Sequence, residues 1–448
     1  MVVTSFNYGQ FVIDAVDSVL AQTFKDLEVI VVEGGSSNPT SRLVVAGLQR
    51  PRTRVLMQGE GHGAGANRNF GISQARGRYV CCLDADDTLA PTYIEKALFL
   101  LERHGCDVVS SALEMVGDEQ GQVNIMEQPD LNALLDSNQV LTCAVFRRSL
   151  WEQAGGYRDV DRAVSGHVHE DWAFWVRLAS LGARFRNLSH DPMLRYRVHK
   201  ASLSRDENML PMSRQRELVR QINHDVLQPN DDRVALSRKR AAIRYGTPSA
   251  PPALIILDRA QSDPRPPTLL LAMPFLILGG AERLLSAVVA HLVQIGWRVV
   301  IATSIDPGAD HGDTTQWFER HTNEIFHLPR GLQPELWEDF VHHLVRSRSA
   351  DVVWVVGSAF AYDCLRGLRA AHPNLRVADL LFNTVGHTAN NRRRRDLIDL
   401  TFVESKEVQS WLLARGEDPM RIRLVESGVD LAALRPMARS EALIRQIG

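Results

Sequence analysis

Short apolar runs rich in β-branched residues alternate along this chain with stretches of helical periodicity. The clearest runs are EVIVV, TRVLM, RYVCCL and DVVSSALEM in the first half, and TLLLAM, RVVIATS and DVVWVVGS in the second. Segments between them, such as QFVIDAVDSVLAQ and PTYIEKALFLLERHG, place apolar residues three and four apart, as helices that cover a sheet do. Strands and helices that alternate in this way form layered structures with mostly parallel sheets. We therefore predict an α/β fold.

A proline-rich stretch divides this pattern into two series. Polar helical sequence follows residue 205, and TPSAPPA and SDPRPP interrupt the pattern before the second series begins at Thr268. Such a composition suits a linker, and 448 residues exceed what one core normally serves. We predict an α/β domain over residues 1–205, a helical extension and linker over 206–267, and a second α/β domain over 268–448.

The composition indicates a globular protein without a nucleic-acid partner. Hydrophobic residues make up 45%, charged residues 23%, and the net charge is -2, which gives no general affinity for polyanions. The longest apolar stretch, LLLAMPFLIL, is too short to cross a bilayer. The five cysteines form no CxxC pair, and Cys81 and Cys82 should be buried as small apolar side chains. We expect a cytoplasmic protein, with the inner face of the membrane as an alternative location.

Three carboxylates follow a predicted buried strand in the sequence YVCCLDADDT. Alternate side chains of a strand share a side, so Asp84 and Asp86 should converge, and Asp87 should begin the next loop. Ligands of open parallel sheets bind at the carboxyl ends of strands, where this cluster falls. Carboxylate oxygens suit Mg²⁺ or Mn²⁺, which in turn bind diphosphate oxygens. The pattern favours a metal and phosphate site over the default for a single Asp, a solvated acidic loop.

The same residues fit a second chemistry. DADDT matches the Asp-x-Asp-x-Thr signature of aspartate-nucleophile phosphatases, in which the first Asp attacks phosphorus. That family usually carries its motif on the first strand, whereas here the motif follows several predicted strands. The neighbouring motifs therefore weigh more heavily in the choice.

Four segments of the first half occur in the order found in one enzyme family. They are TSFNYGQFVIDAVDSVLAQTFKDLEVIVVEGGSSN, GANRNFGISQARGRYVCCLDADD, HEDWAFWVRLASLG and YRVHKASLS. On these segments residues 1–205 resemble a family-2 glycosyltransferase of the GT-A fold. The resemblance implies a nucleotide-sugar donor across the carboxyl edge of the sheet, a Mg or Mn ion, a glycan or lipid-linked acceptor, and a place in surface polysaccharide synthesis.

By matching position, the resemblance implies five donor-binding residues. Thr4, Phe6 and Glu33 would contact the base. Arg68 would reach the nucleotide or diphosphate, whose oxygens suit a guanidinium fork, and Asp84 would hold ribose or metal. The sequence departs from the family at VVEGGSS, where two adjacent Asp residues are common, so the identity of the base stays open.

The resemblance also implies metal-binding and catalytic residues. Asp86 would bind the metal, and His199 matches a position where some relatives use a histidine near metal or diphosphate, with an ordinary histidine as an equal alternative. Asp171, at a predicted helix start, would be the general base of an inverting transfer, or a carboxylate that only stabilises the helix. Trp172 and Trp175 are three apart and would stack on a sugar or, as we favour, lie in the core.

Three segments of the second half carry another resemblance. GGAERLLSAVVAHLVQIGWRVVIATS, TFVESKEVQSWLLARG and RLVESGVDLAALRP are similar to the N-terminal, acceptor-side domain of family-4 glycosyltransferases with the GT-B fold. Gly279 and Gly280 suit a phosphate at a helix N-terminus, and a tight turn explains them equally well. The sequence ends about a dozen residues after Pro436, where that family continues into a donor domain. We expect this half not to transfer sugar by itself, and to be a truncated product, an acceptor-binding appendage or a packing partner.

A basic run from Arg392 to Arg395 completes the candidate sites. It would suit an anionic lipid-linked acceptor or the membrane surface, but a solvated helix face is the favoured interpretation. The predicted function is an inverting, metal-dependent glycosyltransferase. The alternatives are an aspartate-nucleophile phosphatase and a non-catalytic protein that binds glycan or nucleotide.

Overall fold

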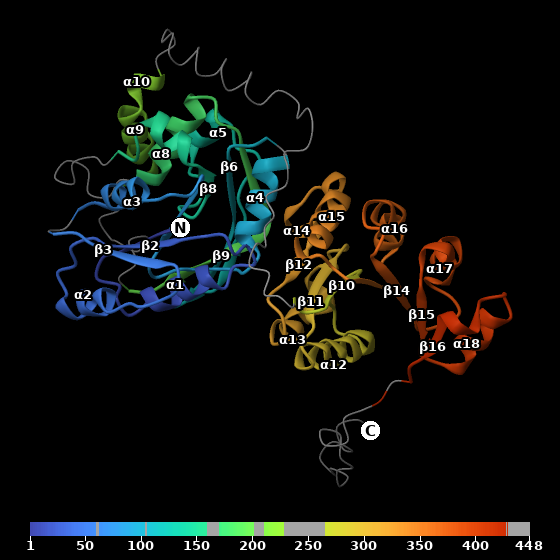
Figure 1. Cartoon of the computed structure of the whole chain (residues 1–448). Coiled ribbons are helices and arrows are strands. Elements are labelled where there is room, and N and C mark those ends of the chain that lie inside the picture. Colours follow the sequence, from blue (N-terminus) through green and yellow to red (C-terminus); the bar gives the residue numbers. More distant parts are fainter. Residues whose placement is uncertain are drawn as a thin grey trace, which may run out of the picture.

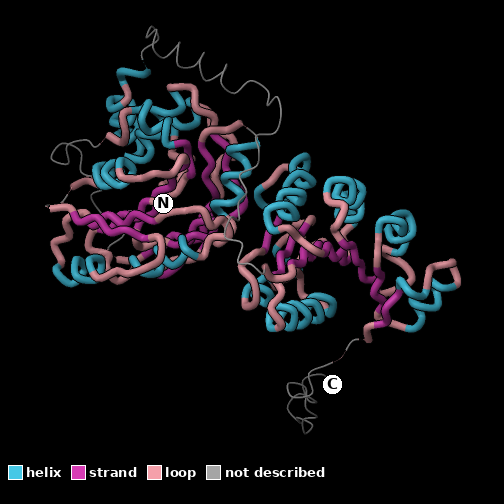
Figure 2. Tube along the Cα trace, viewed as in Figure 1, coloured by secondary structure: helices cyan, strands magenta, loops and turns pink. Residues whose placement is uncertain are grey.

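Two β-sheets with helices on both faces make up the described part of the chain (Figures 1 and 2). The computed structural model describes residues 1–59, 62–103, 105–158, 170–200, 210–227, 265–426 and 428. Most of the predicted proline-rich linker lies outside these residues, as does the predicted segment after residue 428. Within the described residues, no helix combines the length and apolar character needed to cross a membrane.

The first sheet is mixed and nine-stranded, with the order β3-β2-β1-β4-β8-β6-β9-β5 and with β7 paired to β6. Its strands are β1 (Val2–Ser5), β2 (Val29–Glu33), β3 (Thr53–Met57), β4 (Tyr79–Asp84), β5 (Thr88–Leu89), β6 (Val108–Gly117), β7 (Gly121–Val123), β8 (Val145–Arg147) and β9 (Phe185–Val198). Its helices are α1 (Val12–Leu20), α2 (Pro39–Ala46), α3 (Ala64–Ser73), α4 (Tyr93–Arg103), α5 (Leu131–Asp136), α6 (Arg148–Ala154), α8 (Glu170–Ser180), α9 (Met212–Ile222) and α10 (His224–Leu227).

The second sheet is seven-stranded and wholly parallel, with the order β12-β11-β10-β13-β14-β15-β16. Its strands are β10 (Thr268–Met273), β11 (Arg298–Thr303), β12 (Ile325–His327), β13 (Val352–Val356), β14 (Arg376–Leu381), β15 (Leu400–Val403) and β16 (Ile422–Leu424). Its α-helices are α12 (Gly280–Gln294), α13 (Thr315–Glu319), α14 (Leu328–Gly331), α15 (Trp337–Arg348), α16 (Ala359–Ala371), α17 (Thr388–Arg394) and α18 (Lys406–Leu413). Single 3-10 turns are η2 (Ala309–His311), η3 (Pro334–Leu336), η4 (Arg395–Leu397) and η5 (Pro419–Arg421).

The expectation of a mostly parallel sheet is correct for the second half and wrong for the first. In the first sheet β4 pairs in antiparallel fashion with β8, and β8 does so with β6, so only β3, β2, β1 and β4 form a continuous parallel block. The reason is local: β6 runs on into an antiparallel pairing with β7, and β8 then returns between β4 and β6 in the opposite direction.

Apolar faces of the helices determine how the layers stack. Helices α1 and α4 pack on one face of the first sheet, and α3, α5, α6 and α8 on the other. Helices α15 and α16 cover one face of the second sheet, and α12 and α13 cover the opposite one. Helix α4 is unusual because every side chain from Tyr93 to Leu101 is buried. A helix buried on all sides must have neighbours on all sides.

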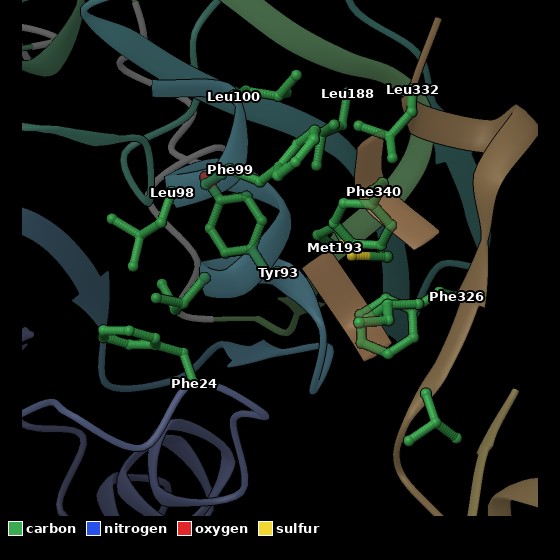
Figure 3. Packing of buried hydrophobic residues seen from close by; sticks show 14 of the residues in the cluster. Phe24, Tyr93, Leu98, Phe99, Leu100, Leu188, Met193, Phe326, Leu332 and Phe340 are labelled. Carbon is green, nitrogen blue, oxygen red and sulfur yellow. The ribbon is translucent and has the colours of Figure 1, made fainter. Parts of the chain in front are cut away.

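The second half provides the missing neighbours of α4. One hydrophobic cluster includes α1, α4 and part of β9 from the first half together with α14, α15 and α16 from the second. Figure 3 shows the residues that meet there: Phe99, Leu188 and Met193 from the first half, and Phe326, Leu332 and Phe340 from the second. The two sheets therefore share a core rather than a surface contact.

The imidazole of His327, at the end of β12, should make folding stability sensitive to pH. Its Nδ1 lies 2.9 Å from Thr303 Oγ1 and its Nε2 lies 3.1 Å from Thr315 Oγ1. Burial, with Arg330 and Lys96 nearby, lowers the pKa of His327 to about 3. The unfolded chain takes up this proton near pH 6.5 and the folded protein does not, so the free energy of unfolding should fall below pH 6.5 by up to about 1.4 kcal/mol per pH unit.

Urea denaturation of wild type and His327→Gln at pH 7, 6 and 5 measures this effect. The variant should lose less stability over this range, because glutamine keeps donors and acceptors for both threonines without taking up a proton. His291→Gln, at an exposed position, is the control. Equal pH slopes for wild type and His327→Gln would show that another group controls the acid response.

Candidate active site

Three neighbouring strands end at one edge of the first sheet and carry predicted site residues there. Thr4 on β1 lies in register with Asp84 on β4, and Ser5 lies in register with Glu33 at the end of β2. Because all three strands are parallel, their last side chains share one edge. The donor-binding residues predicted from the ends of these strands therefore lie close together.

The Asp84 carboxylate anchors a chain of polar contacts across this edge. Its Oδ1 accepts hydrogen bonds from Thr4 Oγ1 at 3.0 Å and from Arg68 Nη2 at 2.9 Å. Arg68 is only 3% exposed, and its Nη1 donates to Glu170 Oε1. Burial opposes the guanidinium charge, but Asp84 and Glu170 outweigh it and raise the pKa of Arg68 above its ordinary value. Arg68 thus joins the strand edge to the start of helix α8.

The three carboxylates lie at the end of β4 and in the segment that directly follows it, and each has different partners. The strand ends at Asp84, and Ala85 and Asp86 form a turn, so strand alternation does not extend to Asp86. Asp86 Oδ2 lies 3.2 Å from His199 Nε2 instead. Asp87 is buried, and its Oδ1 accepts a hydrogen bond from the backbone amide of Arg197 at 2.9 Å. Strand alternation is therefore the wrong reason for bringing Asp84 and Asp86 together, although the Asp84 charge does reach Asp86 across the turn and raises its pKa.

Asp86 and His199 offer a donor set that fits a divalent ion. Burial, followed by the charge of Asp84, raises the pKa of Asp86, and these effects outweigh the hydrogen bond from His199. One carboxylate oxygen and one imidazole nitrogen suit Mn²⁺ and, less well, Mg²⁺. Among the described residues, no group of three or more His, Cys, Asp or Glu side chains is arranged to hold a metal. Water or diphosphate oxygens would have to complete the coordination.

Asp171 lies in the first turn of α8, beside Glu170. Its Oδ2 accepts hydrogen bonds from Asn138 Nδ2 at 3.3 Å and Thr142 Oγ1 at 3.2 Å, and its Oδ1 accepts one from the Trp172 backbone amide at 2.7 Å. These three bonds fix the orientation of the carboxylate. Through Glu170 and Arg68, this helix start is connected to Asp84.

Residues 1–161 match the family described as Glycosyl transferase family 2. This region is a family-2 glycosyltransferase domain. The chain is 31% identical over 133 residues to succinoglycan biosynthesis protein ExoO of Rhizobium meliloti (strain 1021). The aligned stretch covers 30% of this chain and 38% of ExoO. It is 24% identical over 225 residues, 50% of the chain and 83% of the relative, to the Escherichia coli UDP-Glc:alpha-D-GlcNAc-diphosphoundecaprenol beta-1,3-glucosyltransferase WfaP.

A solved structure is also similar to part of this chain. S. aureus TarS 1-349 in complex with UDP-GlcNAc aligns with 55% of this chain and 72% of its own, at 18% sequence identity and a TM-score of 0.42. The match to ExoO spans less than two fifths of that protein's length, with 38% covered. The family-4 resemblance of the second half stays a prediction.

The other predicted donor residues of the family-2 domain differ in accessibility. Phe6 follows β1 and is 41% exposed, so its ring is open to a ligand. Glu33 is fully buried, and its carboxylate accepts hydrogen bonds from the backbone amides of Gly35 at 3.1 Å and Ser36 at 2.7 Å. Glu33 therefore shapes the loop after β2 in this structure.

Two residues of the family-2 site were not predicted from the sequence. Glu170 pairs with Arg68 across 102 positions. Arg197 donates from Nε to the backbone oxygen of Asp86 at 2.9 Å and lies over the Phe11 ring. Strand alternation gave no signal for Arg197, because β9 ends at Val198, before His199. Nothing local to Glu170 identifies its partner.

The predicted core position of the two tryptophans is confirmed. Trp172 is 1% exposed and Trp175 is fully buried, so neither offers a platform for sugar. Cys81 and Cys82 are buried free thiols, as expected.

The two candidate ligand-binding positions of the second half, the loop at Gly279 and the basic run from Arg392, contact acidic side chains of the protein itself. A Cβ atom on Gly279 would lie 2.4 Å from Glu282 Oε2, which places a carboxylate at the start of α12, where a phosphate was considered. In the basic run, Arg392 pairs with Glu417, and Arg394 pairs with Asp363 at 3.0 Å. The favoured interpretation, a solvated helix face, is therefore only partly correct, because Arg392 and Arg394 pair with acidic neighbours.

Proposed function

We propose that this chain is an inverting, metal-dependent glycosyltransferase that moves a sugar from a nucleotide-sugar donor to a glycan or lipid-linked acceptor. One observation carries the proposal: Arg68, inside the region that matches family 2, connects Asp84 at the strand edge to the helix start that holds Asp171, beyond that region. The buried Arg68 thereby joins the residues that would bind the donor to the helix start that carries the proposed base.

The strand edge would bind the donor. Exposed Phe6 would stack on the base beside Thr4, and the loop held by Glu33 would line the nucleoside pocket. Asp86 and His199 would hold Mg or Mn, which supplies positive charge against the diphosphate. Arg68 would keep Asp84 oriented toward the ribose or metal.

Asp171 would act as the general base. Its hydrogen bonds from Asn138 and Thr142 orient Oδ2. The acceptor hydroxyl oxygen would attack the anomeric carbon while its proton passes to Asp171. The bond from that carbon to the diphosphate oxygen breaks as the new bond forms, and the nucleoside diphosphate leaves. A single displacement of this kind inverts the anomeric configuration.

The names of the relatives support the proposed acceptor and setting. ExoO is named for succinoglycan biosynthesis, and WfaP for glucosyl transfer to a diphosphoundecaprenol-linked GlcNAc. We extend this to a surface polysaccharide pathway, with the enzyme in the cytoplasm or at the inner face of the membrane. The division into residues 1–205, 206–267 and 268–448, with a family-4-like acceptor-side module last, belongs to the same proposal.

Calorimetric titration of UDP, GDP and dTDP, with and without Mn²⁺, tests the donor site. Wild type should bind one of them with micromolar affinity in a metal-dependent way. Asp86→Ala should weaken that binding by at least about tenfold, since losing even an outer partner of a metal site costs about 10–100-fold.

Asp26→Ala is the matched control, because Asp26 is exposed and lies away from the strand edge. Its affinity should equal that of wild type. Absence of binding in wild type would rule out a working donor site and favour a non-catalytic role. Binding unaffected by Asp86→Ala would leave the transferase but remove Asp86 from the metal site.

A further inference from the structure

A buried ionic cluster joins helix α4 of the first half to helix α15 of the second. Arg348 donates from Nη1 and Nη2 to the two oxygens of Glu95, at 2.5 and 2.7 Å, and from Nε to Glu324 Oε2 at 2.7 Å. His343 Nε2 lies 2.8 Å from Glu95 Oε1. All four side chains are buried. Because Arg348 donates to both carboxylate oxygens of Glu95, this bidentate pair fixes α4 and α15 in one relative geometry.

Aromatic packing beside this cluster reinforces the same contact. The rings of Phe99 on α4 and Phe340 on α15 meet edge to face, with centroids 4.8 Å apart. Phe326 on β12 packs on Phe340 at 5.5 Å (Figure 3). Because each ring is almost wholly buried, separating the halves would expose all three to water.

A second contact places helix α14 directly on strand β9. A Cβ atom on Gly331 would lie 2.9 Å from both Asp191 Oδ2 and Leu188 Cδ2. Asp191 cannot easily yield, because it is buried and its Oδ2 accepts a hydrogen bond from Lys96 Nζ at 2.6 Å. The backbone of α14 thus approaches β9 as closely as a glycine allows.

Strand β9 is irregular at this point. Ser111 of β6 pairs with Leu188, but the next residue, Ala112, pairs with Pro192, so the segment around Asp191 bulges from the ladder. A bulge sets the register of the pairing beyond it, and a one-residue slip there would turn every later side chain to the opposite face. Helix α14 covers the bulge, and Lys96 secures it from the α4 side.

The far end of β9 enters the donor site. Leu194 and Arg195 pair with β5, directly after the carboxylate turn. Arg197 then bonds to Asp87 and to the backbone oxygen of Asp86, and His199 reaches the Asp86 carboxylate. The register of β9 therefore decides whether Arg197 and His199 meet the carboxylates.

We propose that the second half is a positioning partner of the family-2 site, which holds β9 in register through the Gly331–Asp191 contact. This inference rests on the proposed donor site and deepens it. Gly331 and Asp191 are positioning residues, since their effect on a nucleotide passes through β9.

Nucleotide affinity of the full chain tests this role. Gly331→Ala should raise the Kd of whichever of UDP, GDP and dTDP wild type binds with Mn²⁺ by about tenfold, within the range of coupling between distant sites. Gly280→Ala is the matched control, because a Cβ atom there would meet no atom within 4 Å. A merely structural role would lower the midpoint of thermal unfolding without changing the Kd of the folded protein. An unchanged Kd in Gly331→Ala would overturn the inference alone, whereas wild type that binds no nucleotide would overturn the proposed function with it.

If Gly331→Ala does not fold, hydrogen–deuterium exchange of the wild-type chain tests the same inference. Coupling is reciprocal, so the bound nucleoside diphosphate should slow exchange in α14 and α15 as well as in β9. Protection confined to the loops of the first sheet, with residues 328–348 unchanged, would overturn the inference.

Discussion

Asp171→Asn should lower kcat for sugar transfer by about 10²–10⁴-fold, the usual contribution of a general base. Asparagine keeps the shape of the side chain and can still accept hydrogen bonds from Asn138 and Thr142, but it cannot take a proton from the acceptor hydroxyl. Donor affinity should stay near that of wild type, because Asp171 lies at the start of α8 rather than at the strand edge. Single-turnover transfer from the donor identified by nucleotide titration, followed by chromatography of the product, measures the loss.

Asp136→Asn is the matched control for the base, since Asp136 is largely exposed and pairs with Arg216 on the surface. It should leave kcat unchanged. Transfer by Asp171→Asn at the wild-type rate would remove Asp171 from the mechanism. Metal-dependent phosphate release from phosphate esters that survives in Asp171→Asn would instead support chemistry led by an aspartate nucleophile.

Arg348→Met should lower the free energy of unfolding by about 3–5 kcal/mol, the cost of leaving a buried charge without its partner. Arg348 is the main partner of Glu95 and one of two arginines on Glu324, and all three side chains are buried. Burial alone would raise the pKa of Glu95, but Arg348 and His343 outweigh it and hold that pKa well below its usual range. Without Arg348, the Glu95 carboxylate would have to take a proton or draw in water. Urea denaturation followed by tryptophan fluorescence at pH 7 measures the change.

Two further variants separate the ionic cluster from general effects on α15. Arg346→Met changes an exposed arginine two positions away and should alter stability by less than about 0.5 kcal/mol. Glu95→Met combined with Arg348→Met should recover part of the loss, because removing both charges leaves less uncompensated charge than removing one. A loss below about 1 kcal/mol in Arg348→Met would mean that water already reaches the cluster.

Much of the fold follows from local sequence patterns. The runs from EVIVV to DVVWVVGS all became strands, and QFVIDAVDSVLAQ and PTYIEKALFLLERHG became α1 and α4. These features depend on residues a few positions apart, where periodicity carries the information. The cluster at Asp84 was likewise located at the correct edge of the sheet, because parallel strands must end together.

The remaining features depend on residues far apart in the sequence. Glu170 meets Arg68 across 102 positions, and Arg348 meets Glu95 across 253, so neither pair leaves a local pattern. Strand β9 was missed because Pro192 and the polar residues before it interrupt the apolar alternation, and its pairing tolerates them only through a bulge. The complete burial of α4 could not be predicted, because Glu95 and Lys96 interrupt its apolar residues and the partners that cover it lie partly in the other half.

Because the two halves share a core, the boundary seen in the sequence does not divide the protein into two independent folding units. The proline-rich stretch is a boundary in the sequence, yet the hydrophobic cluster and the Glu95–Arg348 pair continue from one sheet to the other. A fragment that ended there would contain the family-2 motifs, but its α4 would lack the neighbours that α14, α15 and α16 provide. Inheritance of the first half as an independent module would therefore require its buried face to be redesigned.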